Sequence, residues 1–176
     1  MILRKINAAV GLLSTVFLLI HAVIVAIWTL SRGRIAISAG FMPWILLGLV
    51  LIHALISIDL AISAHEDSEN RKCKSYPKLN VPTMIQRISG IVLIVFTALH
   101  VAGAAGFMQP PHLVHAILPP LFFGIALTHV AVSTSKAFIT LGIGNAKFVR
   151  TVDIVMKVIC GVTLIADIAG FYLYIL

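Results

Sequence analysis

The sequence predicts an all-α integral membrane protein, built as a bundle of five transmembrane helices. Of its 176 residues, 60% are hydrophobic and 11% are charged. The apolar residues gather in five runs, each close to the ~20 residues that a helix needs to cross a bilayer. These runs cannot be core helices of a water-soluble protein of this length, because no polar face would remain to cover them.

We expect a single domain, 1–176, with helices over roughly 6–30, 41–64, 85–108, 113–140 and 150–175. The first run is too long for a secretory signal peptide, and no small-residue cleavage site followed by a soluble domain comes after it. Pro43 stands at the start of the second run, and Pro119 and Pro120 lie near the entry to the fourth, since an early helical turn accommodates proline. The polar stretch 65–87 is expected to be a solvated loop.

Basic residues predict the orientation of these helices. Eleven of them lie before the first helix, between the second and third, or around the link between the fourth and fifth, whereas only Arg32 and Arg34 lie on the opposite side. Cytoplasmic segments carry the excess of lysine and arginine, so the N-terminus is expected in the cytoplasm and the C-terminus outside. The charge of +7 is thus explained by topology, and no nucleic-acid partner is expected.

Four histidines lie deep within the first four apolar runs, and their surroundings repeat. His21 and His100 each follow a glycine by ten residues, with valine and phenylalanine five and four residues before the histidine. His53 and His129 share the pattern Pro-x4-Gly-x2-Leu-x-His-x3-Ser. An imidazole inside a bilayer is costly and by default indicates a functional site.

The repeat also predicts how the histidines pair. The first two helices match the third and fourth, and both copies start on the cytoplasmic side. A parallel repeat of this kind implies a pseudo-two-fold axis along the membrane normal. His21 and His100 would then lie at one depth as an outer pair, and His53 and His129 at another as an inner pair.

Two matched histidine pairs are typical of a protein that holds two haems. Bis-histidine ligation needs two neutral imidazoles that approach one iron from opposite sides, and facing helices of a bundle can supply them. We therefore expect a four-helix haem-binding bundle with two b haems, whose iron ligands are His21 with His100 and His53 with His129. The glycines that precede these histidines are candidates for close approach of a ring to the backbone: Gly11, Gly48, Gly90 and Gly124.

Further polar residues have two interpretations each. Lys136 lies seven residues after His129, on the same helix face and ~10 Å nearer the cytoplasm, which suits a propionate of the inner haem or an ordinary snorkelling lysine. Asp59 and Asp167 are intramembrane acids, suited to a proton relay or quinone site or to bonding a neighbouring helix. The remaining histidines are interfacial and are expected not to be ligands: His65, His112 and His115.

Several segments resemble one family, the dihaem cytochrome b membrane anchors of succinate dehydrogenase and fumarate reductase. TMIQRISGIVLIVFTALH (83–100) looks like the QRxSG…H helix of that family, and LRKINAAVGLLSTVFLLIH is similar to its first helix. LIHALISIDLAIS and THVAVSTSKAFITLGI resemble the second and fourth ligand helices. The fifth helix, preceded by AKFVRTVD, is ligand-free in both, so the resemblance covers nearly the whole chain.

The resemblance implies an anchor for a flavoprotein subunit with FAD and an iron–sulfur subunit with its clusters, docked on the cytoplasmic side of a bacterial or archaeal cytoplasmic membrane. It implies the same two ligand pairs, and quinone or menaquinone as substrate. The chain departs from some members of that family at two acidic positions. Those members have a glutamate where this chain has Leu127. They also have an acidic residue in the first outer loop, whereas Leu30–Met42 contains none.

The expected function is that of the electron-transfer subunit of a succinate:quinone or quinol:fumarate oxidoreductase, with no dicarboxylate active site on this chain. Arg71, Lys72, Lys74 and Lys78 are candidates to steer an acidic partner surface. One alternative is the dihaem cytochrome b anchor of a different membrane oxidoreductase. Another is a small transporter or channel that uses the histidines for protons or metal. The absence of CxxC and CxxCH motifs disfavours iron–sulfur ligation, structural zinc and covalent haem attachment.

Overall fold

Five α-helices make up the computed structural model, which describes residues 2–35, 37–38, 40–70, 81–104, 107 and 112–175, without the side chains of 64–70 and 112–116. The helices are α1 (Ile2–Leu30), α2 (Met42–Asn70), α3 (Val81–Ala104), α4 (His112–Leu141) and α5 (Ala146–Ile175). All five are long and apolar enough to cross a membrane, and the described residues contain no strand. The prediction of an all-α protein with five helices able to span a membrane is confirmed for the described residues.

The helix ends differ from the prediction around the polar stretch 65–87. Helix α2 continues to Asn70, beyond the expected end near 64, and α3 covers Val81–Ala104 instead of 85–108. Much of the expected loop is therefore helical. The prediction ended each helix where apolar residues end, but a helix can extend past the bilayer because water solvates its polar side chains. Pro82 stands in the first turn of α3, where its missing N–H costs nothing.

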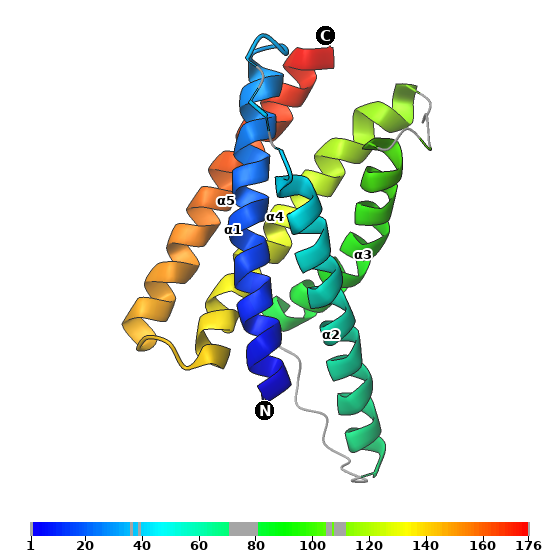
Figure 1. The fold of residues 1–176 in the computed structure, drawn as a ribbon. Coiled ribbons are helices and arrows are strands. Elements are labelled where there is room, and N and C mark those ends of the chain that lie inside the picture. Colours follow the sequence, from blue (N-terminus) through cyan, green and yellow to red (C-terminus); the bar gives the residue numbers. More distant parts are fainter. Residues whose placement is uncertain are drawn as a thin grey trace.

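Helices α1, α4 and α5 pack against one another, α2 packs against α1, and α3 packs against α4 (Figure 1). The N-terminus and the α4–α5 turn lie at one end of the bundle, and the C-terminus and the α1–α2 connection lie at the other (Figure 1). Among the described residues, α1 does not pack closely against α3, and α2 does not pack closely against α4. The paired histidines therefore belong to helices that are not packed tightly together.

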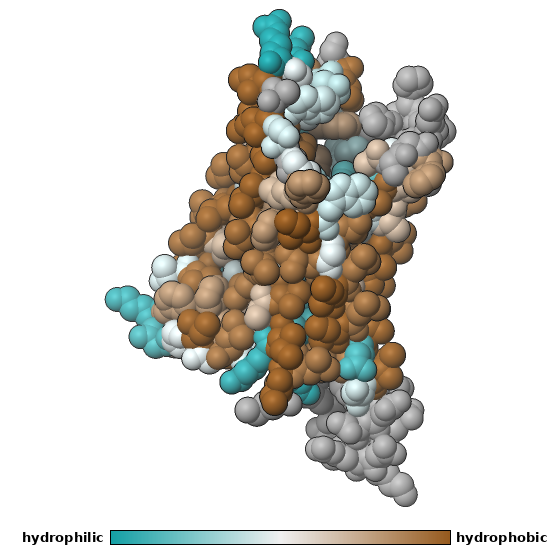
Figure 2. Space-filling model, viewed as in Figure 1, coloured by the Kyte–Doolittle hydropathy of each residue, from teal (hydrophilic) through white to brown (hydrophobic). Residues whose placement is uncertain are grey.

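The core lies where α1, α4 and α5 meet. Leu127 and Val130 of α4 bury against Cys160 of α5, and Leu18 and Leu19 of α1 cover this cluster. Helices α2 and α3 bury few side chains, and on the face shown in Figure 2 a broad hydrophobic band covers the middle of the bundle, with hydrophilic residues gathered towards its ends. This distribution fits a bundle whose middle faces lipid.

Helices α1 and α5 approach most closely near the end of the bundle that carries the C-terminus. A Cβ atom built on Gly170 of α5 would collide with the hydroxyl of Thr29 and would lie 3.2 Å from the backbone nitrogen of Leu30. The rings of Trp28 and Tyr174 contact each other just beyond, with centroids 4.5 Å apart. Tryptophan and tyrosine are typical of this interfacial depth in membrane proteins.

Replacement of Gly170 tests this crossing. We expect Gly170→Ala to lower the free energy of unfolding by about 1–3 kcal/mol, because the backbone of α1 cannot yield to the added methyl group. Gly161→Ala on the same helix is the matched control, since its Cβ would meet nothing within 4 Å. Unfolding in detergent measures both variants. Equal stability of the two variants would contradict the close α1–α5 contact.

Candidate histidine site

The imidazole of His53 on α2 is fixed by the backbone of α1. Its Nδ1 atom lies 3.2 Å from the carbonyl oxygen of Asn7. A carbonyl only accepts hydrogen bonds, so Nδ1 of His53 carries the proton and donates it. The lone pair of the neutral ring is then on Nε2, the nitrogen that can bind a metal ion.

Neighbouring residues on α1 complete the surroundings of His53. A Cβ on Gly11 would lie 3.0 Å from Cε1 of the imidazole, so a larger residue there would require the ring to shift away from α1. The side-chain amide of Asn7 donates to the hydroxyl of Ser57, one turn after His53, at 3.0 Å. Backbone and side-chain contacts thus hold α2 against α1 at the level of the histidine.

His129 on α4 is held by α3 through similar contacts. Its Nδ1 atom lies 2.9 Å from the hydroxyl oxygen of Ser89, and the ring also hydrogen-bonds to the backbone of Gln86. The Ser89 hydroxyl donates to the carbonyl of Ile85 at 2.7 Å, so its oxygen accepts from the ring. These partners place the proton of His129 on Nδ1 and again leave the lone pair on Nε2.

Gly90 on α3 lies against His129 as Gly11 lies against His53. A Cβ at Gly90 would meet Cε1 of the His129 ring at 3.2 Å. The imidazoles of His53 and His129 lie within electrostatic range of each other. The structure therefore brings the predicted inner pair together across α2 and α4.

The predicted outer pair lines one cavity. His21 of α1 and His100 of α3 border a small cavity of about 60 Å³, together with residues of α4 and with Asp167 of α5. The ring of His100 stacks on Phe122 of α4, with centroids 5.1 Å apart. Nδ1 of His21 is buried without a hydrogen-bond partner in the described residues. The outer histidines thus come together, but their rings lack the polar contacts of the inner pair.

Lys136 lies at the end of α4 nearer the α4–α5 turn, within electrostatic range of His129. Its ammonium group donates to Gln86 Oε1 at 2.9 Å and to Thr83 Oγ1 at 3.1 Å, both on α3. An ammonium group has three N–H donors, so one remains for a further acceptor. The position agrees with the one expected from helix spacing.

Other residues singled out in the sequence have different surroundings. Asp59 is exposed on α2, whereas Asp167 is 1% exposed. Ser133 bonds back to the carbonyl of His129 on its own helix. Cβ atoms on Gly48 and Gly124 would meet nothing within 4 Å, so these glycines do not approach a histidine ring. The side chains of His65, His112 and His115, and the residues Arg71, Lys72, Lys74 and Lys78, lie outside the described part of the structure.

Three residues that contact the inner histidines were not singled out from the sequence. Asn7 and Gln86 bond through their backbone oxygens, which no side-chain motif reveals. Ser89 lies in the segment QRISG, but nothing in that segment indicates that its hydroxyl contacts His129. A signal was nevertheless present. Asn7 precedes His21 by the same fourteen residues by which Gln86 precedes His100.

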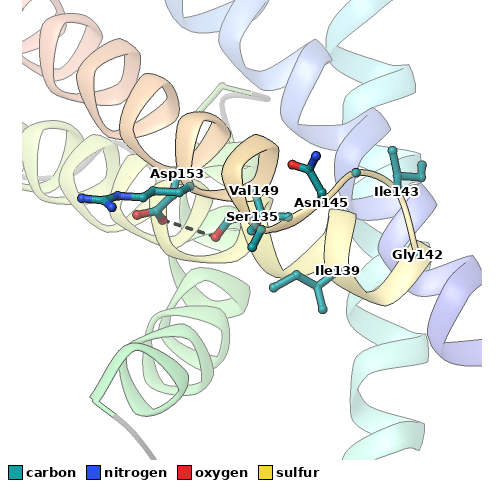
Figure 3. A pocket seen from close by; sticks show the side chains of 10 residues that line it. Ser135, Ile139, Gly142, Ile143, Asn145, Val149 and Asp153 are labelled. Atoms are coloured by element: carbon teal, nitrogen blue, oxygen red, sulfur yellow. Dashed lines mark hydrogen bonds between the residues drawn. The ribbon is translucent and has the colours of Figure 1, made fainter.

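A larger pocket of about 610 Å³ opens at the α4–α5 turn, away from the four histidines (Figure 3). The Ser135 hydroxyl donates to a carboxylate oxygen of Asp153 at 3.3 Å across it, and Asp153 pairs with Lys157 at 2.6 Å (Figure 3 shows the first contact). No histidine lines this pocket, so it is separate from the histidine site.

Comparison of the chain with protein-family models, curated proteins and solved structures finds no match. In the described residues, no group of three or more histidine, cysteine, aspartate or glutamate side chains is placed to hold a metal ion. The site consists instead of two pairs of imidazoles.

Loss of the Ser89 hydroxyl tests how His129 is held. We expect Ser89→Ala to lower the free energy of unfolding by about 1 kcal/mol, because Nδ1–H of His129 loses an acceptor. Ser133→Ala is the matched control, since that hydroxyl bonds only to carbonyls of its own helix. A double-mutant cycle with His129→Ala isolates the pair, and a coupling energy near zero would show that the contact contributes nothing.

Proposed function

We propose that this chain is the membrane-anchor cytochrome b subunit of a succinate dehydrogenase/fumarate reductase-type complex. Two b haems, held by His21 with His100 and by His53 with His129, carry electrons between quinone or quinol and an iron–sulfur subunit. The observation that carries the proposal is the hydrogen bonding of the inner histidines, His53 and His129. Both donate Nδ1–H to a neighbouring helix and keep the lone pair on Nε2. Histidines that bind a metal ion almost always donate their other ring N–H in this way.

The inner site fits a haem in three respects. Its two imidazoles come from helices that are not closely packed together, which suits two ligands approaching one iron from opposite sides. Gly11 and Gly90 let each ring lie close to the adjoining helix. Lys136 keeps a spare N–H donor on the side nearer the N-terminal end, where a haem propionate needs a cation. When bound, haem b supplies reversible one-electron transfer.

Contacts at matching positions support the internal repeat. The carbonyl of Asn7 and the backbone of Gln86, each fourteen residues before the outer histidine of its own helix, both bond to an inner histidine. Gly11 and Gly90, each ten residues before the same outer histidines, both lie against the inner rings. A pseudo-two-fold arrangement of α1–α2 and α3–α4 explains both correspondences.

The outer site must widen to take a haem. Its cavity of about 60 Å³ is far below the ~300–1,000 Å³ of typical cofactor sites. Among the described residues α3 packs closely only against α4, so α3 is the helix that can move away from α1. His100, which is exposed on α3, would move with it.

The partners follow from the resemblance of the ligand helices to the anchor family. This chain holds the haems and tunes them through ligands, burial and nearby charge, while the flavoprotein and iron–sulfur subunits supply FAD, the clusters and the dicarboxylate site. The excess of basic residues at the end that carries the N-terminus makes this the cytoplasmic, partner-facing end of a bacterial or archaeal cytoplasmic membrane protein.

Haem content and histidine replacement test the cofactor. We expect the purified protein to hold two haems b with low-spin bis-histidine spectra. His21→Ala and His100→Ala should lose one and the same haem, and His53→Ala and His129→Ala the other, while His65→Ala, His112→Ala and His115→Ala keep both. Reduced-minus-oxidised spectra and pyridine haemochromes measure this. A haem-free wild type, or a shared phenotype of His21 and His53 variants, would contradict the assignment.

Co-purification tests the complex. An affinity tag on this chain, used in mild detergent on membranes of the native organism, should retain an FAD-containing subunit and an iron–sulfur subunit. Their dithionite-reduced clusters should be reoxidised by a quinone only when the chain keeps its haems. Recovery of two haems together with a different dehydrogenase would leave the cytochrome intact but overturn the assigned partner.

A further inference from the structure

Asp167 of α5 is the most deeply buried polar residue described. It is 1% exposed, and both of its carboxyl oxygens lack a hydrogen-bond partner among the described residues. Burial of polar atoms without partners costs several kcal/mol in an apolar medium, about 4–8 kcal/mol for transfer to a hydrocarbon solvent. We therefore expect this carboxyl group to have a hydrogen-bonding role. Asp167 lines the cavity between His21 and His100.

His21 carries a ring nitrogen that also lacks a hydrogen-bond partner among the described residues. Its Nδ1 atom is buried and unpartnered, whereas Nδ1 of His53 and of His129 each donate to an oxygen on a neighbouring helix. The ten residues that line the outer cavity include only three with polar side chains, His21, His100 and Asp167. Among these, the carboxyl group of Asp167 is the one oxygen acceptor.

The cavity is large enough to connect the two groups. Its volume of about 60 Å³ corresponds to roughly two water molecules at ~30 Å³ each. Helices α1 and α5 are also packed together, and Gly170, one turn after Asp167, fixes their close approach. The carboxyl group is therefore held beside α1 with space for a water molecule.

We propose that Asp167 is the positioning residue of the outer histidine pair. Its carboxyl group accepts a hydrogen bond from Nδ1–H of His21 through one water molecule in the cavity that both residues line, and this bond would leave Nε2 of His21 as the iron ligand. The inference rests on the proposed haem function. A carboxylate that receives the second ring N–H fixes the tautomer and orientation of a ligating histidine and raises its basicity. A more basic ligand favours ferric over ferrous iron and lowers the reduction potential of the outer haem.

Three variants of the full-length, haem-loaded protein test this role. Asp167→Leu removes the acceptor at similar volume, Asp167→Asn keeps one acceptor oxygen, and Thr163→Val removes a different buried polar group one turn away on α5. Redox titration followed in the visible spectrum resolves the two haems, so the inner haem serves as the internal reference. Haem retention after detergent dilution and the electron paramagnetic resonance signal of each ferric haem are recorded in parallel.

We expect Asp167→Leu to favour reduction of the outer haem at least tenfold, a rise of about 59 mV for one electron, and to weaken outer-haem retention by about 10- to 100-fold. Asp167→Asn should retain the outer haem at an intermediate potential, and Thr163→Val should match the wild type. The inner haem should not change in any variant.

These measurements distinguish a failure of the proposed haem function from a failure of the role assigned to Asp167. Wild-type protein without haem refutes the proposed function and this inference with it. Two haems in the wild type, combined with an Asp167→Leu outer haem that matches the wild type in potential and retention, refute only the role of Asp167. If Asp167→Leu does not fold, Asp167→Asn decides: an outer haem that matches the wild type in both potential and retention overturns the proposal.

Discussion

A ring N–H that is buried away from water is costly unless an oxygen atom accepts its hydrogen bond, and this cost bears on each of the four histidines within the helices. The inner histidines meet this requirement across a helix–helix contact. His53 of α2 donates to the backbone of α1, and His129 of α4 donates to Ser89 and the backbone of α3. These bonds tie the helices into two pairs, α1–α2 and α3–α4. They also fix which ring nitrogen keeps its lone pair.

Much of the remaining architecture depends on these two pairs. The apolar core belongs to α1, α4 and α5, and few side chains of α2 and α3 are buried. Among the described residues, α2 packs closely only against α1, and α3 packs closely only against α4. A haem of the proposed kind, bound between the helices that carry one histidine pair, would stabilise the folded bundle by mass action. The same group would explain why helices with matched histidines are not packed directly together.

The two histidine pairs differ in their polar surroundings. Neutral oxygens of backbone and serine surround the inner rings, and the cation Lys136 lies within electrostatic range of His129. The outer rings share their cavity with the carboxyl group of Asp167 and otherwise with apolar side chains. Hydrogen bonds to the ligands, burial and nearby charge are the means by which a protein sets the potential of a haem. The two histidine pairs therefore lie in different electrostatic surroundings, which would give two proposed haems different potentials.

The sequence by itself predicted five helices long and apolar enough to span a membrane, and the grouping of the four histidines into two pairs, because hydropathy and spacing along a helix depend only on residue order. It placed Lys136 on the face of His129 for the same reason. It did not determine the polar ends of α2 and α3, since apolar length alone does not mark where a helix ends in water. The partners of the rings were decided by tertiary structure. Backbone oxygens of Asn7 and Gln86 carry no side-chain signature, and the position of Asp167 beside His21 depends on how α5 packs against α1 at Gly170.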